Sequence, residues 1–342
     1  MENSDLHALA QAGLWRQLPR DAFTRESLTA RNAAGNTPLH SAAKYGCLAD
    51  LPAEFMTAEF LSLRNEAGYT PLHHAAIGGH LDQIPAALPS AALFGLRSNS
   101  GYTVFHVAAA YGHLGQIQPG LMTSAAILGQ NDVGGTVLHE AAESGTLGQV
   151  PAEFVTAANL AIKNIGGETV LHVAALNGHL DQIPPALLTA DALREKTNAG
   201  DTVFHAAAIA GHLGQIPAAL LTHDNMVAAS KSGFTVIHAA AETGQLNRIP
   251  RGRLTRDLLL TRNDNGDTPL HAAAFEGHLD QVPAELLTQE LLNVRSYNGA
   301  TVGRIALNRG FGGQIPAALR PKAPGLIGNF LQKTGLSRPP FA

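Results

Sequence analysis

Apolar residues along this chain return in the same order every 33 residues. The stretch Leu-His-Ser-Ala-Ala at 39–43 becomes Leu-His-His-Ala-Ala at 72–76 and Leu-His-Ala-Ala-Ala at 270–274. One such segment is too short to bury its own apolar face, whereas stacked copies share a continuous core. The pattern therefore predicts a solenoid of repeated helical units.

Two glycine ladders and a threonine–histidine pair define the first half of each unit. Glycine recurs every 33 residues from Gly35 to Gly299, with threonine two residues later and, in the first eight units, histidine three residues after that. A second ladder runs from Gly13 to Gly310. The first glycine suits a turn with positive φ, the threonine suits a helix N-cap, and the second glycine suits a helix C-terminus. Each unit is predicted to begin with a turn and a short helix.

A ladder of prolines interrupts the second half of each unit. It runs through Pro19, Pro52 and Pro85 and then from Pro151 to Pro316, with Gln118 at the missing position. A proline inside a helix costs about 3 kcal/mol or more, and nine of them would exceed the roughly 5–15 kcal/mol that stabilises a typical native state. Each proline is therefore expected at the first position of a fresh turn.

Polar residues around the proline predict how this break is accommodated. The threonine that follows is expected to be the N-cap of a third short helix; examples are Thr57, Thr156, Thr189 and Thr288. The glutamine two residues before the proline is expected to bond backbone groups freed at the break; examples are Gln83, Gln182 and Gln281.

The repeated unit resembles an ankyrin repeat. Thr-Pro-Leu-His occurs at 37–40, 70–73 and 268–271, followed by Ala-Ala, and Gly-His-Leu follows at 79–81 and 277–279. Five middle units carry valine in place of the proline, and the proline-broken second half departs from the uninterrupted second helix of the family. The likeness covers residues 6 to about 319. It implies an all-α ankyrin-repeat solenoid with a 33-residue period, about nine to ten stacked units and short finger loops.

The period divides the chain into three parts. Residues 1–31 are predicted to form an N-terminal capping partial repeat, 32–319 an array of nine 33-residue units with a divergent last one, and 320–342 a C-terminal tail. Trp15 is expected to pack against the first full unit. Residues 326–331 are expected either to form an amphipathic turn that closes the last repeat or to fray.

Composition and charge narrow the class of protein. The 23 basic residues are outnumbered by 27 acidic ones, and the finger tips carry no regular Lys/Arg stripe, so no nucleic-acid partner is expected. The local cluster of Arg248, Arg251, Arg253 and Arg256 is attributed to a solvated outer edge. The chain shows neither an apolar run of about eighteen residues nor the pattern of a secretory signal. We expect no membrane partner, and a reducing, cytoplasmic location or delivery into a host cytoplasm.

The polar residues do not predict catalysis. Nine of the 16 histidines occupy the Thr-x-x-His place, counting His7, and five occupy the Gly-His-Leu place, where they are expected to tie units together. Glu140 and Glu143 share a helix face but have no partner that would make them an acid and base pair. Cys47 replaces a Gly-His-Leu histidine and is expected to be a half-buried apolar thiol rather than a nucleophile. We expect no catalytic residue, metal, cofactor or small-molecule substrate.

The positions that the repeat leaves free are the candidate binding residues. They lie beside the turn glycine and just before the helix-ending glycine, and in the ankyrin family they line the finger tips and the concave groove. All five tyrosines fall in this set, and acidic residues occupy it in the middle units. Aromatic side chains are enriched in interface cores. The predicted partner-binding residues are Tyr45, Tyr69, Tyr102, Tyr111, Asp132, Glu143, Glu168, Asp201, Phe234, Phe275 and Tyr297.

The sequence therefore predicts a monomeric, non-catalytic scaffold that binds a protein or peptide along its groove and finger tips. A peptide with apolar anchors and basic residues would suit an aromatic N-terminal half and an acidic centre. Alternatives stay open. The residues could be ordinary surface, or the chain could assemble with itself through the segment around Phe330, or it could be a translocated bacterial effector that targets a host protein. An enzyme would need a site built from several units.

Overall fold

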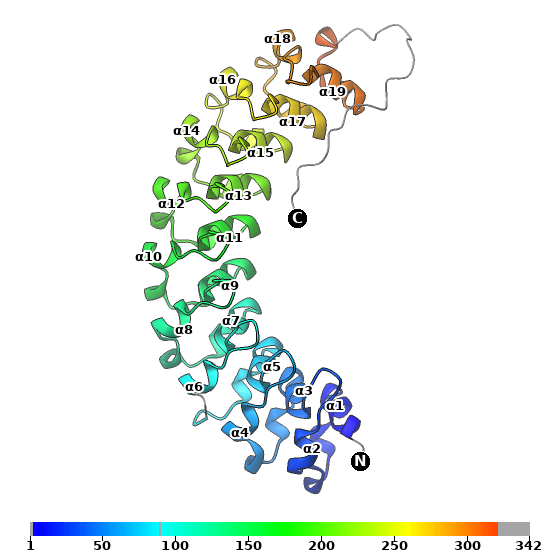
Figure 1. Cartoon of the computed structure of the whole chain (residues 1–342), viewed down its shortest axis with the longest axis vertical. Coiled ribbons are helices and arrows are strands. Elements are labelled where there is room, and N and C mark those ends of the chain that lie inside the picture. Colours follow the sequence, from blue (N-terminus) through cyan, green and yellow to red (C-terminus); the bar gives the residue numbers. More distant parts are fainter. Residues whose placement is uncertain (1–2, 89, 321–342) are drawn as a thin grey trace.

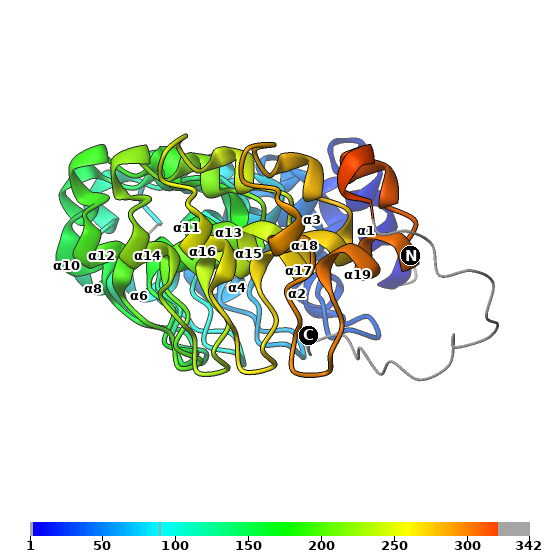
Figure 2. The ribbon, with the colours of Figure 1, turned by 90° about the horizontal axis from the view of Figure 1, so that it is seen from above.

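The chain forms a crescent of stacked helical units (Figure 1). The computed structural model describes residues 3–88 and 90–320 of the 342. Within these ranges the fold is all-α, without a strand, and it contains isolated β-bridges such as the one between Lys163 and Thr169 at the base of a finger. Longer helices line the concave side and shorter ones the convex side (Figure 1), and the finger loops project together from one edge (Figure 2).

The inner layer consists of α-helices of seven to nine residues, each packed on the corresponding helix of the next unit. These helices are α1 (Asn3–Gln11), α3 (Pro38–Tyr45), α5 (Pro71–Gly78), α7 (Val104–Ala110), α9 (Val137–Ser144), α11 (Val170–Asn177), α13 (Val203–Ile209), α15 (Val236–Glu242), α17 (Pro269–Glu276) and α19 (Val302–Asn308). The alanines two and three residues after each ladder histidine, such as Ala42 and Ala43, are fully buried, which lets adjacent helices approach closely.

The predicted start and end of the inner helices are confirmed. Helix α5 begins after Thr70, the N-cap, with Pro71 in the first turn, and ends at Gly79, whose φ is +75°. A Cβ atom at Gly79 would come within 2.7 Å of Nε2 of His113 in the next unit. Gly79 therefore serves both the left-handed cap and the close approach of neighbouring units.

The outer layer is split, as predicted. It consists of α-helices of four or five residues, and the structure gives them as α2 (Arg25–Thr29), α4 (Ala58–Leu61), α6 (Ala91–Phe94), α8 (Ser124–Leu128), α10 (Ala157–Leu160), α12 (Ala190–Arg194), α14 (His223–Met226), α16 (Arg256–Leu260) and α18 (Gln289–Leu292). The threonine N-cap is confirmed at Thr57, Thr156, Thr189 and Thr288, each accepting a hydrogen bond from the backbone N–H three residues on.

Short 3-10 turns of three residues join the two layers. They are η1 (Trp15–Gln17), η2 (Arg20–Ala22), η3 (Leu48–Asp50), η4 (Ala53–Phe55), η5 (Leu81–Gln83), η6 (Leu114–Gln116), η7 (Pro119–Leu121), η8 (Leu147–Gln149), η9 (Ala152–Phe154), η10 (Leu180–Gln182), η11 (Pro185–Leu187), η12 (Leu213–Gln215), η13 (Ala218–Leu220), η14 (Leu246–Arg248), η15 (Leu279–Gln281), η16 (Gly312–Gln314) and η17 (Ala317–Leu319).

The ladder prolines lie one residue earlier than predicted. Pro52 precedes η4 rather than opening it, with φ −57° and ψ 137°. This extended ψ leaves the Pro52 carbonyl free to accept the first hydrogen bond of the turn, from Phe55 N–H at 2.9 Å. Among the described 3-10 turns, η7 and η11 begin with a proline, Pro119 and Pro185, and both lie outside the ladder.

The prediction for the glutamine ladder was wrong about its partner. Gln83 does bond backbone, but Nε2 donates to the Gly46 carbonyl of the preceding unit at 2.9 Å, not to groups at its own break. Gln116 likewise donates to Gly79 O at 2.7 Å and accepts from Leu81 N–H at 3.0 Å. The amide therefore satisfies the end of one inner helix and the start of the 3-10 turn that follows it.

Trp15 lies in the core of the first, partial unit. The Trp15 indole is fully buried, donates to the Leu6 carbonyl at 2.9 Å and meets Phe23 edge-on. Cys47 of the first full unit closes the same core, with Sγ 3.2 Å from Ala10 O. At 2% exposure Cys47 is buried outright rather than half-buried, and burial raises the pKa of its thiol. Residues 326–331, with Phe330, lie outside the described residues.

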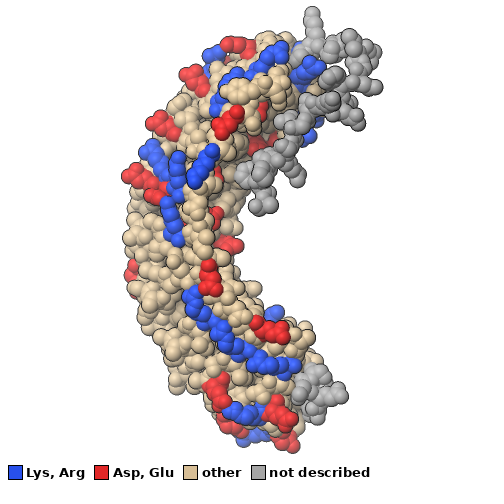
Figure 3. Space-filling model, in the orientation of Figure 1, with Lys and Arg blue, Asp and Glu red and all other residues tan. Residues whose placement is uncertain are grey.

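A ladder of basic side chains, missed in the sequence, runs beside the fingers. Four residues before the turn glycine, seven of the nine units carry Arg or Lys, and Gln130 and Ala229 fill the other two places. Broken rows of Lys and Arg are visible along one face of the crescent (Figure 3). Arg31, Lys163 and Arg262 each donate to the backbone carbonyl 33 residues on, at 2.6, 3.0 and 2.8 Å. These cations join successive units.

Candidate interaction surface

The predicted binding residues lie on the inner helices and the fingers, and their side chains differ in exposure. Tyr297, Tyr111 and Tyr45 are exposed, at 74%, 55% and 41%. Asp132 and Glu143 are also exposed, and the remainder are half-buried, namely Tyr69, Tyr102, Glu168, Asp201, Phe234 and Phe275. In the middle of the crescent, acidic side chains are visible at the concave edge (Figure 3).

Three of the tyrosines lie within electrostatic range of an acidic pair or of one another. Burial raises the pKa of Tyr102 to about 12, and the nearby carboxylates of Glu140 and Glu143 and the phenol of Tyr69 add to the rise. Burial also raises the pKa of Tyr69, with contributions from Tyr111 and Glu140. These residues come from three successive units, so the stacking of α5, α7 and α9 builds one cluster.

Glu140, at the centre of this cluster, was not predicted as a binding residue. Its side chain is 8% exposed, and Oε1 accepts a hydrogen bond from Asn131 Nδ2 at 3.1 Å. Burial and the adjacent Glu143 raise its pKa to about 7, while hydrogen bonding from Tyr102 and Asn131 opposes the rise. Neighbouring units hold Val107 and Val173 at this position. That departure from the repeat was the available signal.

Tyr45 is adjacent to a cation rather than to the acidic pair. It ends α3, and the ammonium of Lys44 stands 5.5 Å from its ring centroid. A cation already lies over this ring, so Tyr45 offers the groove an exposed apolar edge.

Three other predicted residues already make polar or cation–π contacts with side chains of the same chain. Asp132 pairs with Arg97 at 2.8 Å, and Glu168 accepts from Asn164 Nδ2 at 2.8 Å. The guanidinium of Arg309 lies 4.0 Å from the centre of the Phe275 ring.

The remaining predicted residues lie far along the array from the tyrosine cluster. Phe234 packs against His238 at 5.6 Å, and the Arg262 guanidinium lies 5.9 Å from the Tyr297 ring centroid. Asp201 is half-buried beside the buried His205. The structure therefore gathers only Tyr69, Tyr102, Tyr111 and Glu143 into one cluster.

Two exposed aliphatic residues at the finger tips were missed. Val133 is 57% exposed and Ile165 is 68% exposed. They lie on adjacent fingers, because Ile165 N–H donates to the Val133 carbonyl at 3.0 Å. Both occupy free positions next to a turn glycine, but only aromatic and acidic residues were selected there from the sequence.

The Thr-x-x-His histidines are occupied by structural hydrogen bonds. In the second unit, His73 Nδ1 accepts from Thr70 N–H at 3.1 Å, and Nε2 lies 3.0 Å from the Tyr102 carbonyl oxygen of the next unit. Burial lowers the pKa of His73 to about 4. In the Gly-His-Leu place, His113 bonds Ala76 O of the preceding unit at 2.7 Å. Both sets tie units together, as predicted.

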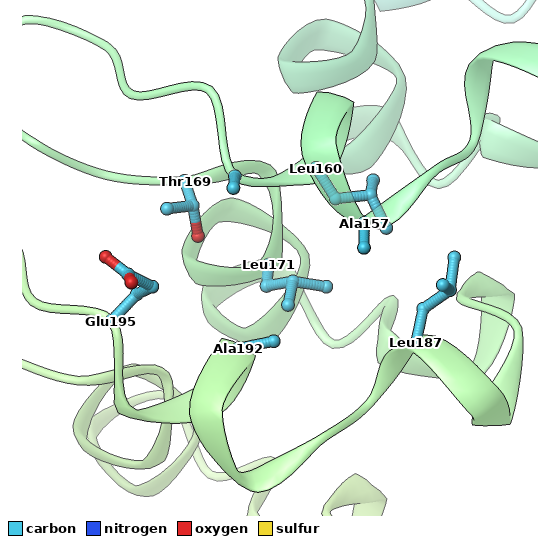
Figure 4. Close-up of a pocket in the computed structure, with 8 residues that line it drawn as sticks. Ala157, Leu160, Thr169, Leu171, Leu187, Ala192 and Glu195 are labelled. Atoms are coloured by element: carbon cyan, nitrogen blue, oxygen red, sulfur yellow. The ribbon is translucent and has the colours of Figure 1, made fainter.

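The structure offers little room for a small organic ligand at the cavity shown in Figure 4. This cavity lies between α10 and α12 and is lined by residues including Leu160, Leu171 and Ala192. Its volume is about 20 Å³, which accommodates about one water molecule. Among the described residues, no group of three His, Cys, Asp or Glu side chains is placed to hold a metal ion. Nor does any described helix have the length and apolarity needed to cross a membrane.

Comparison with known families agrees with this architecture. Residues 171–249 match a family model of three ankyrin repeats, and residues 265–295 match the model of a single ankyrin repeat. No curated protein matches the chain. The repeats of residues 171–295 thus belong to the ankyrin family, and the described chain is an ankyrin-type solenoid.

Proposed function

We propose that this chain is a non-catalytic scaffold that binds a partner protein or peptide along its concave groove and finger tips. Ankyrin repeats serve generally as protein-interaction scaffolds, and the family match supports that role here. Because one fold can carry many functions, the location of the site has to be argued from its residues.

The tyrosine–glutamate cluster is the observation that carries the proposal. Tyr69 comes from one unit and Tyr102 and Tyr111 from the next, and Glu143 of the following unit acts on Tyr102. Tyrosine supplies a large, rigid contact area at low entropic cost, which is why it is enriched where binding energy concentrates. Tyr111 is the most exposed tyrosine of this cluster.

The other proposed contacts extend from this cluster in both directions. Tyr45 would lengthen it toward the N-terminus, and Val133 and Ile165 would add an apolar contact at the finger tips. Asp132, Glu168, Asp201, Phe234, Phe275 and Tyr297 stay in the proposal as polar or peripheral contacts, because several already bind within the chain.

A paired pull-down tests this proposal. The bait variants would be Tyr45→Ala with Tyr111→Ala, and separately Glu143→Lys. These side chains are exposed, so both variants should melt as the native chain does. Glu153→Lys is the matched control, an exposed glutamate in the 3-10 turn η9 that is not among the proposed contacts. Preys retained by the native chain and the control but lost by both variants support the groove. Identical preys on all four baits would reject it.

A further inference from the structure

We propose that Glu140 and Glu143, with Tyr69, Tyr102 and Tyr111, form a pocket for a cationic side chain, lysine or arginine, of the bound partner. This inference rests on the proposed function and specifies the chemistry that the groove recognises. The five residues are called the tyrosine–glutamate pocket below.

Glu140 is a buried carboxylate without a cation partner among the described residues. Its side chain is 8% exposed, and Oε1 accepts a hydrogen bond from the neutral amide of Asn131. The ion pairs of the described residues involve neither Glu140 nor Glu143. Removing a carboxylate from water without a cation is costly, and a second carboxylate beside it adds repulsion.

Packing of the repeat does not require an acid at the position of Glu140. The equivalent residues of the flanking units are Val107, which is buried, and Val173, which packs on the core. A valine fills this place on the inner helix without any desolvation cost. The packing of its own unit therefore does not explain why a glutamate occupies position 140.

The side chains of the tyrosine–glutamate pocket are chemically suited to a cation. Carboxylates form strong charge-assisted hydrogen bonds with ammonium and guanidinium groups, and tyrosine faces attract the same groups. The exposed Tyr111 and Glu143 leave the pocket open to the groove. Lys44 lies over Tyr45, and Arg97 binds Asp132 and the Gln130 carbonyl, so neither pairs with these carboxylates. In this proposal the partner supplies the cation.

Selection of random peptides displayed on phage tests the inference on the full chain. Peptides would be selected on the native protein and re-tested on Tyr111→Ala, which identifies the groove binders. We expect these to share one lysine or arginine. Replacing that residue by norleucine, or using Glu140→Gln, should raise Kd at least tenfold. Glu276→Gln, an exposed glutamate on inner helix α17, is the matched control and should leave Kd unchanged.

The outcomes separate this inference from the function on which it rests. Groove peptides without a shared basic residue, or with the same Kd on Glu140→Gln, would overturn the cation pocket and leave the scaffold intact. Absence of any peptide sensitive to Tyr111→Ala would overturn both. Thermal melting of Glu140→Gln checks that a higher Kd does not result from misfolding. Because the substitution removes a buried charge, the Tm of the variant should equal or exceed that of the native chain.

Discussion

Nε2 of His40 lies 3.0 Å from the backbone carbonyl oxygen of Tyr69 in the next unit. Nδ1 of the same ring accepts from Thr37 N–H at 3.1 Å, so the ring is neutral and carries its proton on Nε2. The same relationship links His73 to Tyr102. Two tyrosines of the tyrosine–glutamate pocket are therefore held at their backbones by the histidine of the unit before.

A histidine in the middle of the array should be costly to remove. His172 is 1% exposed, and its ring bonds Thr169 N–H and Asp201 O, each at 3.2 Å. His172→Ala leaves both backbone groups without a partner and should lower the free energy of unfolding by about 2–4 kcal/mol. Urea unfolding followed by circular dichroism measures this. His223→Ala, at an exposed position off the ladder, should change it by less than about 0.5 kcal/mol, and equal losses would contradict the bridging role.

The histidine ladder predicts loss of stability in mild acid. Burial lowers the pKa of His40, His73, His106 and His238 to about 4, from 6.5. The unfolded chain therefore binds more protons between those values, so stability is complete above pH 6.5 and falls as pH approaches 4. Each group contributes up to about 1.4 kcal/mol per pH unit within that window. Urea midpoints measured from pH 7.5 to 4.5 check this, and a flat profile would refute it.

Glu140 should lower the stability of the fold as pH rises, which is the opposite of the effect of the histidines. Its pKa is raised from 4.5 to about 7, so the folded chain binds the extra proton and this contribution to stability is lost as pH rises through that window. Glu140→Gln should therefore stabilise the protein at pH 8, by about 1–3 kcal/mol, and have little effect at pH 4.5. Thermal melts at both pH values decide the matter. A destabilised variant at pH 8 would show that the carboxylate is compensated within the chain.

The missing position of the proline ladder should accept a proline. Gln118 has φ −58° and ψ 129°, and Ile117 before it is extended, which suits a residue preceding proline. Gln118→Pro should be neutral or stabilising, by up to about 1 kcal/mol. Gln149→Pro is the contrasting variant, because Gln149 N–H donates to Thr146 O at 2.9 Å, and it should destabilise. Chemical denaturation of both variants tests the prediction, which fails if the two behave alike.

The sequence alone was sufficient for the fold because its signals are local and recur in phase. Thr57 as an N-cap and Gly79 as a left-handed cap each depend on a few neighbouring residues. The partner of Gln83 could not be found in that way, since Gly46 lies 37 residues upstream and only the stacking of units brings them together.

The binding site was predicted less completely. Tyrosines stand out in a chain with 5% aromatic residues, and Tyr69, Tyr102 and Tyr111 do cluster. Glu140 was overlooked because the position after each ladder histidine is not among the free positions of the repeat from which candidates were chosen. Val133 and Ile165 were overlooked because aliphatic residues usually signal burial, and their exposure at a finger tip is visible only in three dimensions.

Each kind of inter-unit hydrogen bond spans the same number of residues wherever it occurs, so units could be added or removed without loss of these bonds. His139 bonds Glu168 O, 29 residues on, and Gln215 bonds Gly178 O, 37 residues back. Excision of residues 161–193 would bring His139 to the Asp201 carbonyl and Gln215 to the Gly145 carbonyl, each an equivalent acceptor. Whole units could therefore be gained or lost by in-frame duplication or deletion of 99 nucleotides, which would let the groove change its reach while every junction kept its bonding pattern.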